Sequence, residues 1–181
     1  QMIDLDYRWE WICCDDYYVA LIGGFRYAHM QEDFAAQYST NNVLAVATNV
    51  EFDGYGIRLG AETERFVCCT NFFVYGRGTT SFLGGESKAT YFEGELAAGD
   101  PVIVNTSWEA GRVAYVVDVE LGVGWQSCNG RARASVGYLF NGWYNMVTTA
   151  DWIDAVQATE FDEFDGETTF DGLSARIEFS Y

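Results

Sequence analysis

The sequence predicts an all-β protein, an antiparallel transmembrane β-barrel in which seven strands are visible. Three observations support this fold class. Apolar and polar residues alternate in seven segments with a period of two, which is the side-chain period of a strand. Aromatic residues make up 17% of the chain and proline occurs once, a composition that favours strands over helices. No apolar run approaches the roughly 18 residues of a membrane helix.

Residues 112–126 show the alternation most clearly. The odd positions from Val113 to Trp125 are all apolar, and the even positions are small, acidic or amide with one exception. Tyr115 and Trp125 stand near the two ends of the apolar row, where the two membrane–water boundaries would lie. We therefore expect the odd face of this strand to contact lipid and the even face to line the interior of a barrel.

Six other segments share this pattern, although glycine dilutes it in the fourth segment of the chain. These segments span residues 3–11, 17–29, 54–66, 72–88, 131–147 and 173–181. Short turns are predicted at 13–16, 68–71 and 127–130, and long, acidic, irregular loops at 31–52, 89–111 and 148–171. Short turns on one rim and long loops on the other are typical of outer-membrane barrels.

Charged residues decide which face points inward. Within the strands, the apolar face carries only His29 and Arg65, both close to a strand end. A charge that faces lipid at mid-depth costs roughly 2–4 kcal/mol. A soluble barrel or sandwich, the alternative fold, would place charged residues outside and apolar residues within. The predicted lumen-lining residues are Asp4, Asp6, Arg8, Glu10, Arg26, Arg58, Glu62, Glu64, Arg77, Asp118, Glu120, Arg133, Arg176 and Glu178.

Net charge and the last strand indicate the partners. A formal charge of −17 excludes a basic footprint for nucleic acid. Outer-membrane lipid and small solutes or ions are the expected partners, and an oligomer is compatible with the sequence. The alternation continues through Leu173, Ile177 and Phe179 to a terminal Tyr181. This ending resembles the sorting signal read by the barrel assembly machinery, which predicts a bacterial outer-membrane location.

The order of the segments also resembles the Legionella-type major outer membrane protein family, whose pore-forming relatives are abundant in planctomycetes. The resemblance is carried by dispersed short matches over most of the chain, and it implies a β-barrel pore with further strands before Gln1. It has no catalytic set to transfer. The matching stretches are Leu5-Asp6-Tyr7, Gly23-Gly24-Phe25-Arg26-Tyr27-Ala28-His29, Phe52-Asp53-Gly54-Tyr55-Gly56, Tyr75-Gly76-Arg77-Gly78 and Val119-Glu120-Leu121-Gly122-Val123-Gly124-Trp125, together with the closing strand.

The seven strands form one predicted domain, residues 1–181, with two ways to complete it. Bacterial single-chain barrels have an even number of strands. Either an eighth strand lies in the irregular stretches, or Gln1 begins partway through a larger barrel, which the family resemblance favours. Eight strands enclose only enough space for their own side chains. No signal peptide is visible, so the chain is read as a mature product or a truncated one.

Five cysteines fall in the three predicted short turns. Their expected role is disulfide bonding between turns in an oxidising periplasm, which leaves one thiol over because five is odd. A metal site is the alternative, although adjacent cysteines lack the usual two-residue spacer and no histidine accompanies them. The five residues are Cys13, Cys14, Cys68, Cys69 and Cys128.

Other chemistry has weak support in the sequence. Asp162, Asp165 and Glu167 suggest a weak Ca²⁺ site, without the spacing of an EF-hand loop, and a solvated loop explains them more simply. The pairs Glu62/Glu64 and Asp118/Glu120 resemble glycosidase acids, but nearby lumenal arginines favour ion pairs. His29 has no nucleophile partner and is read as an interfacial aromatic residue. We therefore predict no enzyme and no cofactor.

The sequence leaves three functions open. The first is a porin-like passive pore for small solutes or ions, with a slight preference for cations. The second is a closed structural or adhesive outer-membrane barrel whose loops bind a partner. The third is a soluble, lipocalin-like binding barrel.

Overall fold

Seven strands form a single antiparallel sheet in the order of the chain, as predicted. The computed structural model describes residues 1–14, 17–39, 43–67, 70–95, 102–159, 161 and 164–179. Every neighbouring pair in the sheet is antiparallel. The strands are β1 (Met2–Cys14), β2 (Tyr17–Ser39), β3 (Val43–Phe66), β4 (Phe72–Glu95), β5 (Val102–Gln126), β6 (Ala132–Met146) and β7 (Gly166–Phe179).

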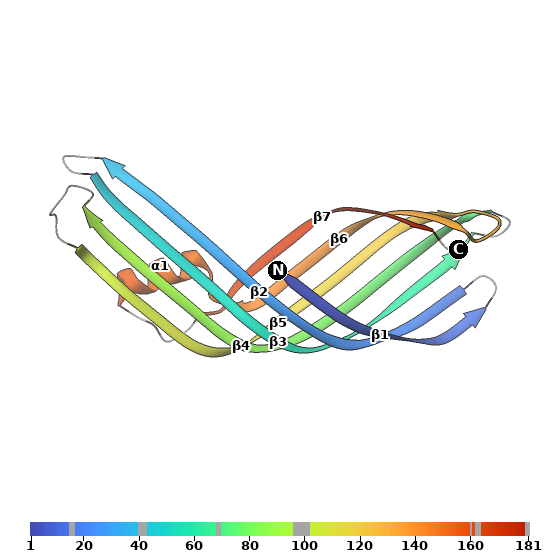
Figure 1. Ribbon diagram of the computed structural model, residues 1–181, viewed down its shortest axis with the longest axis horizontal. Coiled ribbons are helices and arrows are strands. Elements are labelled where there is room, and N and C mark those ends of the chain that lie inside the picture. Colours follow the sequence, from blue (N-terminus) through green and yellow to red (C-terminus); the bar gives the residue numbers. More distant parts are fainter. Residues whose placement is uncertain are drawn as a thin grey trace.

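Two of the predicted long loops, 31–52 and 89–111, are largely strand, and this part of the prediction was wrong. The β2–β3 ladder continues to Ser39 and Val43. The β4–β5 ladder continues, past one irregularity, to Gly94 and Val102. Figure 1 shows β2, β3, β4 and β5 extending well beyond β1, β6 and β7. We call the part of the sheet beside the short turns the proximal half. The part beyond the row through Tyr27, Tyr55 and Val113 is the distal half.

The proximal half exposes its apolar face, as the sequence predicts. The outward residues of β5 from Val113 to Trp125 are intermediate or exposed, and Leu121 is 64% exposed. Leu5, Ile57 and Leu173 show that the same surface continues over β1, β3 and β7. The segment of β5 from Val113 to Trp125 rises about 3.3 Å per residue. At a strand tilt near 40°, it spans about 30 Å along the membrane normal, which is close to a bilayer's hydrocarbon thickness.

The polarity of both faces inverts in the distal half. The first outward positions beyond the boundary row are polar, as in the rows His29–Asp53–Glu86 and Glu51–Lys88–Glu109. The inward positions become apolar, and Val50 and Ala89 are both buried there. This is the usual pattern of an antiparallel sheet with one face in water and one face on a core. The alternation therefore continues along each strand, but with its phase reversed.

A helix covers the inward face of the distal half, within a stretch predicted to be irregular (148–171). Helix α1 (Thr149–Ala158) begins at Thr148, whose side chain accepts a hydrogen bond from the Asp151 amide. Asp151 stands three residues after the cap, as in a capping box. The helix ends at Thr159, which is left-handed with φ 59°. Figure 1 shows α1 lying against the extended part of the sheet. No helix in the described ranges is long and apolar enough to cross a membrane.

Two apolar clusters fill the inward side around and beyond the boundary row. The first lies beside that row and combines Phe52, Leu83, Val116 and Trp143 with smaller neighbours from β2 to β6. The second joins the sheet to the helix and the segment after it. Its buried members are Val50, Ala89, Tyr91, Val147, Trp152, Ala155 and Phe164. Burial of these side chains is what fixes α1 on the sheet.

The sheet is curved but is not closed by hydrogen bonds. Among the described residues, no ladder joins β1 to β7. Side chains of Gln1, Met2, Asn141 and Phe170 nevertheless line one shared cavity of about 620 Å³, so the two edges approach each other near the boundary row. The inward faces of non-neighbouring strands are therefore close enough for direct side-chain contact.

Candidate functional site

Two buried arginines form the centre of an ionic cluster on the inward face of the proximal half. The Arg26 guanidinium contacts Asp4 at 2.7 Å and Asp118 at 2.8 Å. Arg58 contacts Asp4 and Asp6, each at 2.6 Å. Arg26 is 2% exposed and Arg58 is 6% exposed. Charges as buried as these are stable only when they are paired, and each guanidinium here faces at least two carboxylates.

The cluster joins strands that are not neighbours. Arg26 lies on β2 and Asp118 on β5, with β3 and β4 between them in the sheet. Asp4 on β1 contacts both Arg26 on β2 and Arg58 on β3. These bonds bridge the concave side of the sheet rather than run along its surface. The arginines therefore fix the curvature of the proximal half.

The other predicted lumen residues extend the same network toward the short turns. The sequence predicts twelve lumen-lining residues besides Arg26 and Arg58. Within the described residues, each of the twelve except Glu10 has an ion-pair partner within 4.0 Å. The remaining pairs are Arg58–Asp118, Arg77–Asp6, Arg77–Glu62, Arg8–Glu62, Arg133–Glu64, Arg176–Glu120 and Arg176–Glu178. Exposure rises in this direction, and the Arg8, Arg176 and Glu178 side chains are about half exposed.

Uncharged polar side chains complete the cluster, and the predicted list of lumen-lining residues, which holds charged residues only, did not include them. Thr79 donates to Asp118 at 3.0 Å, and Asn141 also donates to Asp118. Tyr75 and Ser174 donate to Glu120 at 2.9 and 2.6 Å. All four residues occupy the polar phase of their strands, which is the signal that could have identified them. Tyr75 is easily missed because an aromatic residue in such a strand suggests the lipid boundary.

Glycines on the inward face of β5 make room for two aromatic rings of β4. A Cβ at Gly124 would lie 2.1 Å from the Phe73 ring, and one at Gly122 would lie 2.6 Å from the Tyr75 ring. Phe73 in turn lies 4.1 Å beneath the Arg133 guanidinium. The small residues in the polar row of β5 are therefore required by close packing inside the sheet.

The arrangement of the cluster favours ion pairing over acid–base catalysis. Asp118 accepts hydrogen bonds from an arginine, a threonine and an amide. Glu62, Glu64 and Glu120 each face an arginine. The one histidine, His29, lies on the opposite face of the sheet. Neither carboxylate pair proposed from the sequence has the separate acid and base environments that hydrolysis of a glycoside requires.

The predicted cysteine and calcium sites fall mostly outside the described residues. Cys13 and Cys14 end β1 instead of lying in the turn, and nothing is described of their side chains or of Cys68 and Cys69. Cys128 is an exposed free thiol whose Sγ accepts a hydrogen bond from Asn71 at 3.2 Å. Asp162 is not described, while Asp165 and Glu167 are exposed.

A second group of ionisable side chains lies on the outward face, just beyond the apolar band. His29 Nδ1 is 2.8 Å from Asp53 Oδ1 and 3.7 Å from Glu51 Oε1. Tyr27 donates to the same Asp53 oxygen at 3.1 Å. The hydrogen bond from His29 lowers the pKa of Asp53 below its usual value. The sequence prediction missed this group because it ended the second strand at His29 and placed residues 31–52 in a loop.

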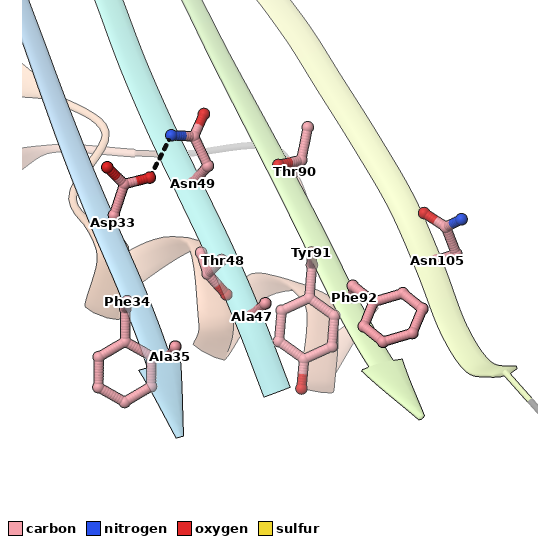
Figure 2. Close-up of a pocket in the computed structure, with 10 residues that line it drawn as sticks. All are labelled: Asp33, Phe34, Ala35, Ala47, Thr48, Asn49, Thr90, Tyr91, Phe92 and Asn105. Carbon is pink, nitrogen blue, oxygen red and sulfur yellow. Dashed lines mark hydrogen bonds between the residues drawn. The ribbon is translucent and has the colours of Figure 1, made fainter. Parts of the chain in front are cut away.

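The outward face of the distal half also carries an open groove of about 430 Å³. Figure 2 shows its lining, which comes from β2, β3, β4 and β5, with α1 drawn behind the sheet. Asn49 donates to Asp33 at 2.7 Å across the strand pair. Thr90 and Asn105 add a hydroxyl and an amide. Ala35, Ala47 and Phe92 add apolar surface, so the groove has a mixed lining.

An apolar outer band, a charged interior and strands that alternate between the two define the wall of an outer-membrane β-barrel. A family model described as Legionella pneumophila major outer membrane protein precursor matches residues 18–180. The chain belongs to this family, which confirms the resemblance seen in the sequence and the bacterial outer-membrane location. No curated protein and no solved structure matches the chain.

Proposed function

We propose that this chain forms the wall of a structural outer-membrane barrel whose lumen is closed by its own side chains. The distal half of the sheet lies on the aqueous side. The observation that carries the proposal is the contact between Arg26 and Asp118, 2.8 Å apart on strands separated by two others. A lumen wide enough for solute needs free space between such strands. Here guanidinium and carboxylate groups occupy that space.

The apolar cluster beside the boundary row adds a second barrier. Phe52, Leu83, Val116 and Trp143 are nearly inaccessible to solvent and lie between the ionic cluster and the helix. An ion that crossed at this level would lose hydrating water without gaining polar ligands, which is unfavourable. Beyond it, α1 covers the inward face. The two barriers in series support a structural role more than conduction.

Planar-bilayer recordings of the full-length protein test the proposal. We expect no steady conductance from the wild type. Replacing Trp143 with Ala removes the largest side chain of the barrier beside the boundary row, so this variant is expected to show brief conducting events. Trp125→Ala, on the outward face, is the matched control and is expected to remain silent. Steady channels from the wild-type protein would refute the closed barrel.

A passive pore for small solutes or ions is the second candidate, and the charged inward face supports it. The predicted lumen residues comprise eight carboxylates and six arginines, a small excess of negative charge. Such a wall favours cations slightly. If the recordings reveal steady channels, reversal potentials in a salt gradient measure the selectivity. A preference for anions would contradict the expected selectivity.

The remaining partners follow from the outer-membrane location. We propose that lipid contacts the exposed apolar band, and that the barrel assembly machinery reads the alternating strand β7. Leu173, Ile177 and Phe179 of this strand are strongly exposed, while Tyr181 lies outside the described residues. The exposed band disfavours the soluble, lipocalin-like alternative, since such a surface would associate in water. Partition into the detergent phase of Triton X-114 is the expected behaviour.

A further inference from the structure

The first outward row beyond the apolar band brings a histidine together with two carboxylates. His29 and Asp53 are direct cross-strand partners on β2 and β3, and Glu51 is two residues from Asp53 on the same face. One ligand atom from each of the three side chains lies within 4.8 Å of the others. The backbone ladder thus fixes the spacing of all three groups, with no loop involved.

The spacing suits a small divalent ion. Bonds of about 2.0–2.2 Å to a tetrahedral Zn²⁺ ion place neighbouring ligand atoms about 3.3 Å apart. His29 Nδ1 is 2.8 Å from the Asp53 oxygen and 3.7 Å from the Glu51 oxygen, on either side of that value. Small rotations of the side chains would bring all three atoms to a common ion, with water as the fourth ligand.

The charge at this position is unbalanced. Among the described residues, Glu51 and Asp53 have no lysine or arginine within 4.0 Å, and their one ion-pair partner is His29. Lys88, the cross-strand partner of Glu51, instead contacts Glu86 at 3.0 Å and Glu109 at 4.0 Å. With a neutral imidazole, the group carries two negative charges, and a divalent cation would neutralise them.

We propose that His29, Glu51 and Asp53 form a binding site for a divalent transition-metal ion. Of Zn²⁺ and Ca²⁺, the two ions used in the experiments below, Zn²⁺ fits the site better. The ion would bind at Nδ1 of His29, replacing the hydrogen bond to Asp53, and the imidazole proton would reside on Nε2. Imidazole nitrogen is a good ligand for Zn²⁺ and a poor one for Ca²⁺ or Mg²⁺. The site lies on the outward face and does not depend on the proposed function.

Zinc binding to the full-length protein in detergent micelles tests the site. The thiols are first alkylated, because cysteine is itself a strong zinc ligand. We expect calorimetry with zinc chloride to show a site that H29Q and D53N each weaken at least tenfold. Glu109→Gln, a carboxylate two strands away from Glu51 in the same outward row, is the matched control and should bind like the wild type. Absence of zinc binding, or an unchanged affinity in H29Q, overturns the proposal.

A second measurement identifies His29 as a ligand and establishes the class of ion. Diethylpyrocarbonate modifies neutral imidazole, and mass spectrometry can follow the peptide that contains His29. Zinc at a saturating concentration should protect this peptide, whereas Ca²⁺ at the same concentration should not. Equal protection by Ca²⁺ would overturn the assignment to a transition metal. Heat-modifiable migration on gels establishes that each variant is folded, so that lost binding reports on the site alone.

Discussion

The two halves of the sheet share four strands yet have opposite cross-sections. In the proximal half, Leu59 of β3 faces outward and Arg58 faces inward. Eight residues away on the same strand, Glu51 faces outward and Val50 is buried inward. The backbone ladder runs through the boundary without a break in β2–β3 pairing. The surroundings therefore decide which face is apolar, and strand geometry decides only that the faces differ.

The difference also shows where each half obtains its stability. The proximal half holds its curvature through ion pairs such as Arg26–Asp118, and its apolar side chains contact the surroundings. The distal half instead has an internal apolar core, in which Trp152 of α1 is 0% exposed. The two halves should therefore respond differently to the same kind of substitution, and two pairs of variants and one pH dependence test this.

The largest expected effect comes from removing a tryptophan in each half. Trp152 contacts the rings of Trp108, Phe161 and Phe164, with centroids 5.7–6.3 Å away. Trp152→Ala should cost about 3–5 kcal/mol, as expected for a fully buried aromatic residue. Hydrogen–deuterium exchange should then accelerate in α1 and leave β6 and β7 protected. Trp125→Ala, at the rim of the apolar band, should change exchange little in α1. Uniform acceleration in both halves would show that they unfold as one unit.

The second-largest difference between the halves is expected when an arginine is placed on the outward face of each. Val119 lies near the middle of the apolar row of β5, whereas Ser107 faces outward in the distal half. Val119→Arg should cost about 2–4 kcal/mol because its charge would enter lipid. Ser107→Arg should cost less than about 0.5 kcal/mol at a hydrated surface. Urea unfolding in lipid vesicles measures both, and equal costs would place Ser107 in the bilayer.

The smallest expected effect is a dependence on alkaline pH confined to the distal half. Burial and the hydrogen bond to Glu93 raise the pKa of Tyr91 to about 12. Between pH 10 and pH 12, the tyrosine of the unfolded chain loses its proton while the folded one keeps it. Stability should therefore fall by up to about 1.4 kcal/mol per pH unit in this window. Tyr91→Phe should remove this dependence when urea unfolding is measured across the window, and a persistent slope in the variant would assign it to another group.

The sequence predicted the proximal half well because a single rule governs it. Each strand there alternates with one phase, so the seven strands could be read directly from the sequence. The distal half was missed because the phase reverses after His29, and a reversed phase looks like the end of a strand. Glu51, Asp53 and His29 were separated for this reason, although their pairing follows once β2 is continued through the boundary.

Other parts depend on contacts between strands that are far apart in the sequence. Arg26 on β2 contacts Asp118 on β5 across the concave side of the sheet, and Phe73 packs where a Cβ at Gly124 would lie. Helix α1 carries a local signal, Thr148 followed by Asp151, but it is short and its apolar face is visible only against Val50 and Ala89. A short amphipathic helix amid acidic residues is difficult to distinguish from a loop.

The phase reversal within β2 and β3 has a consequence for alignment during folding. If β3 slipped by one residue against β2, Ile57 and Leu59 would turn inward among the arginines, while Val50 and Phe52 would turn outward into water. A slip of two residues would keep the faces but move Asp53 into the apolar band. Both errors are penalised at two separate places on the same strand. The reversed pattern within this strand therefore fixes both the register of its pairing and its depth in the membrane.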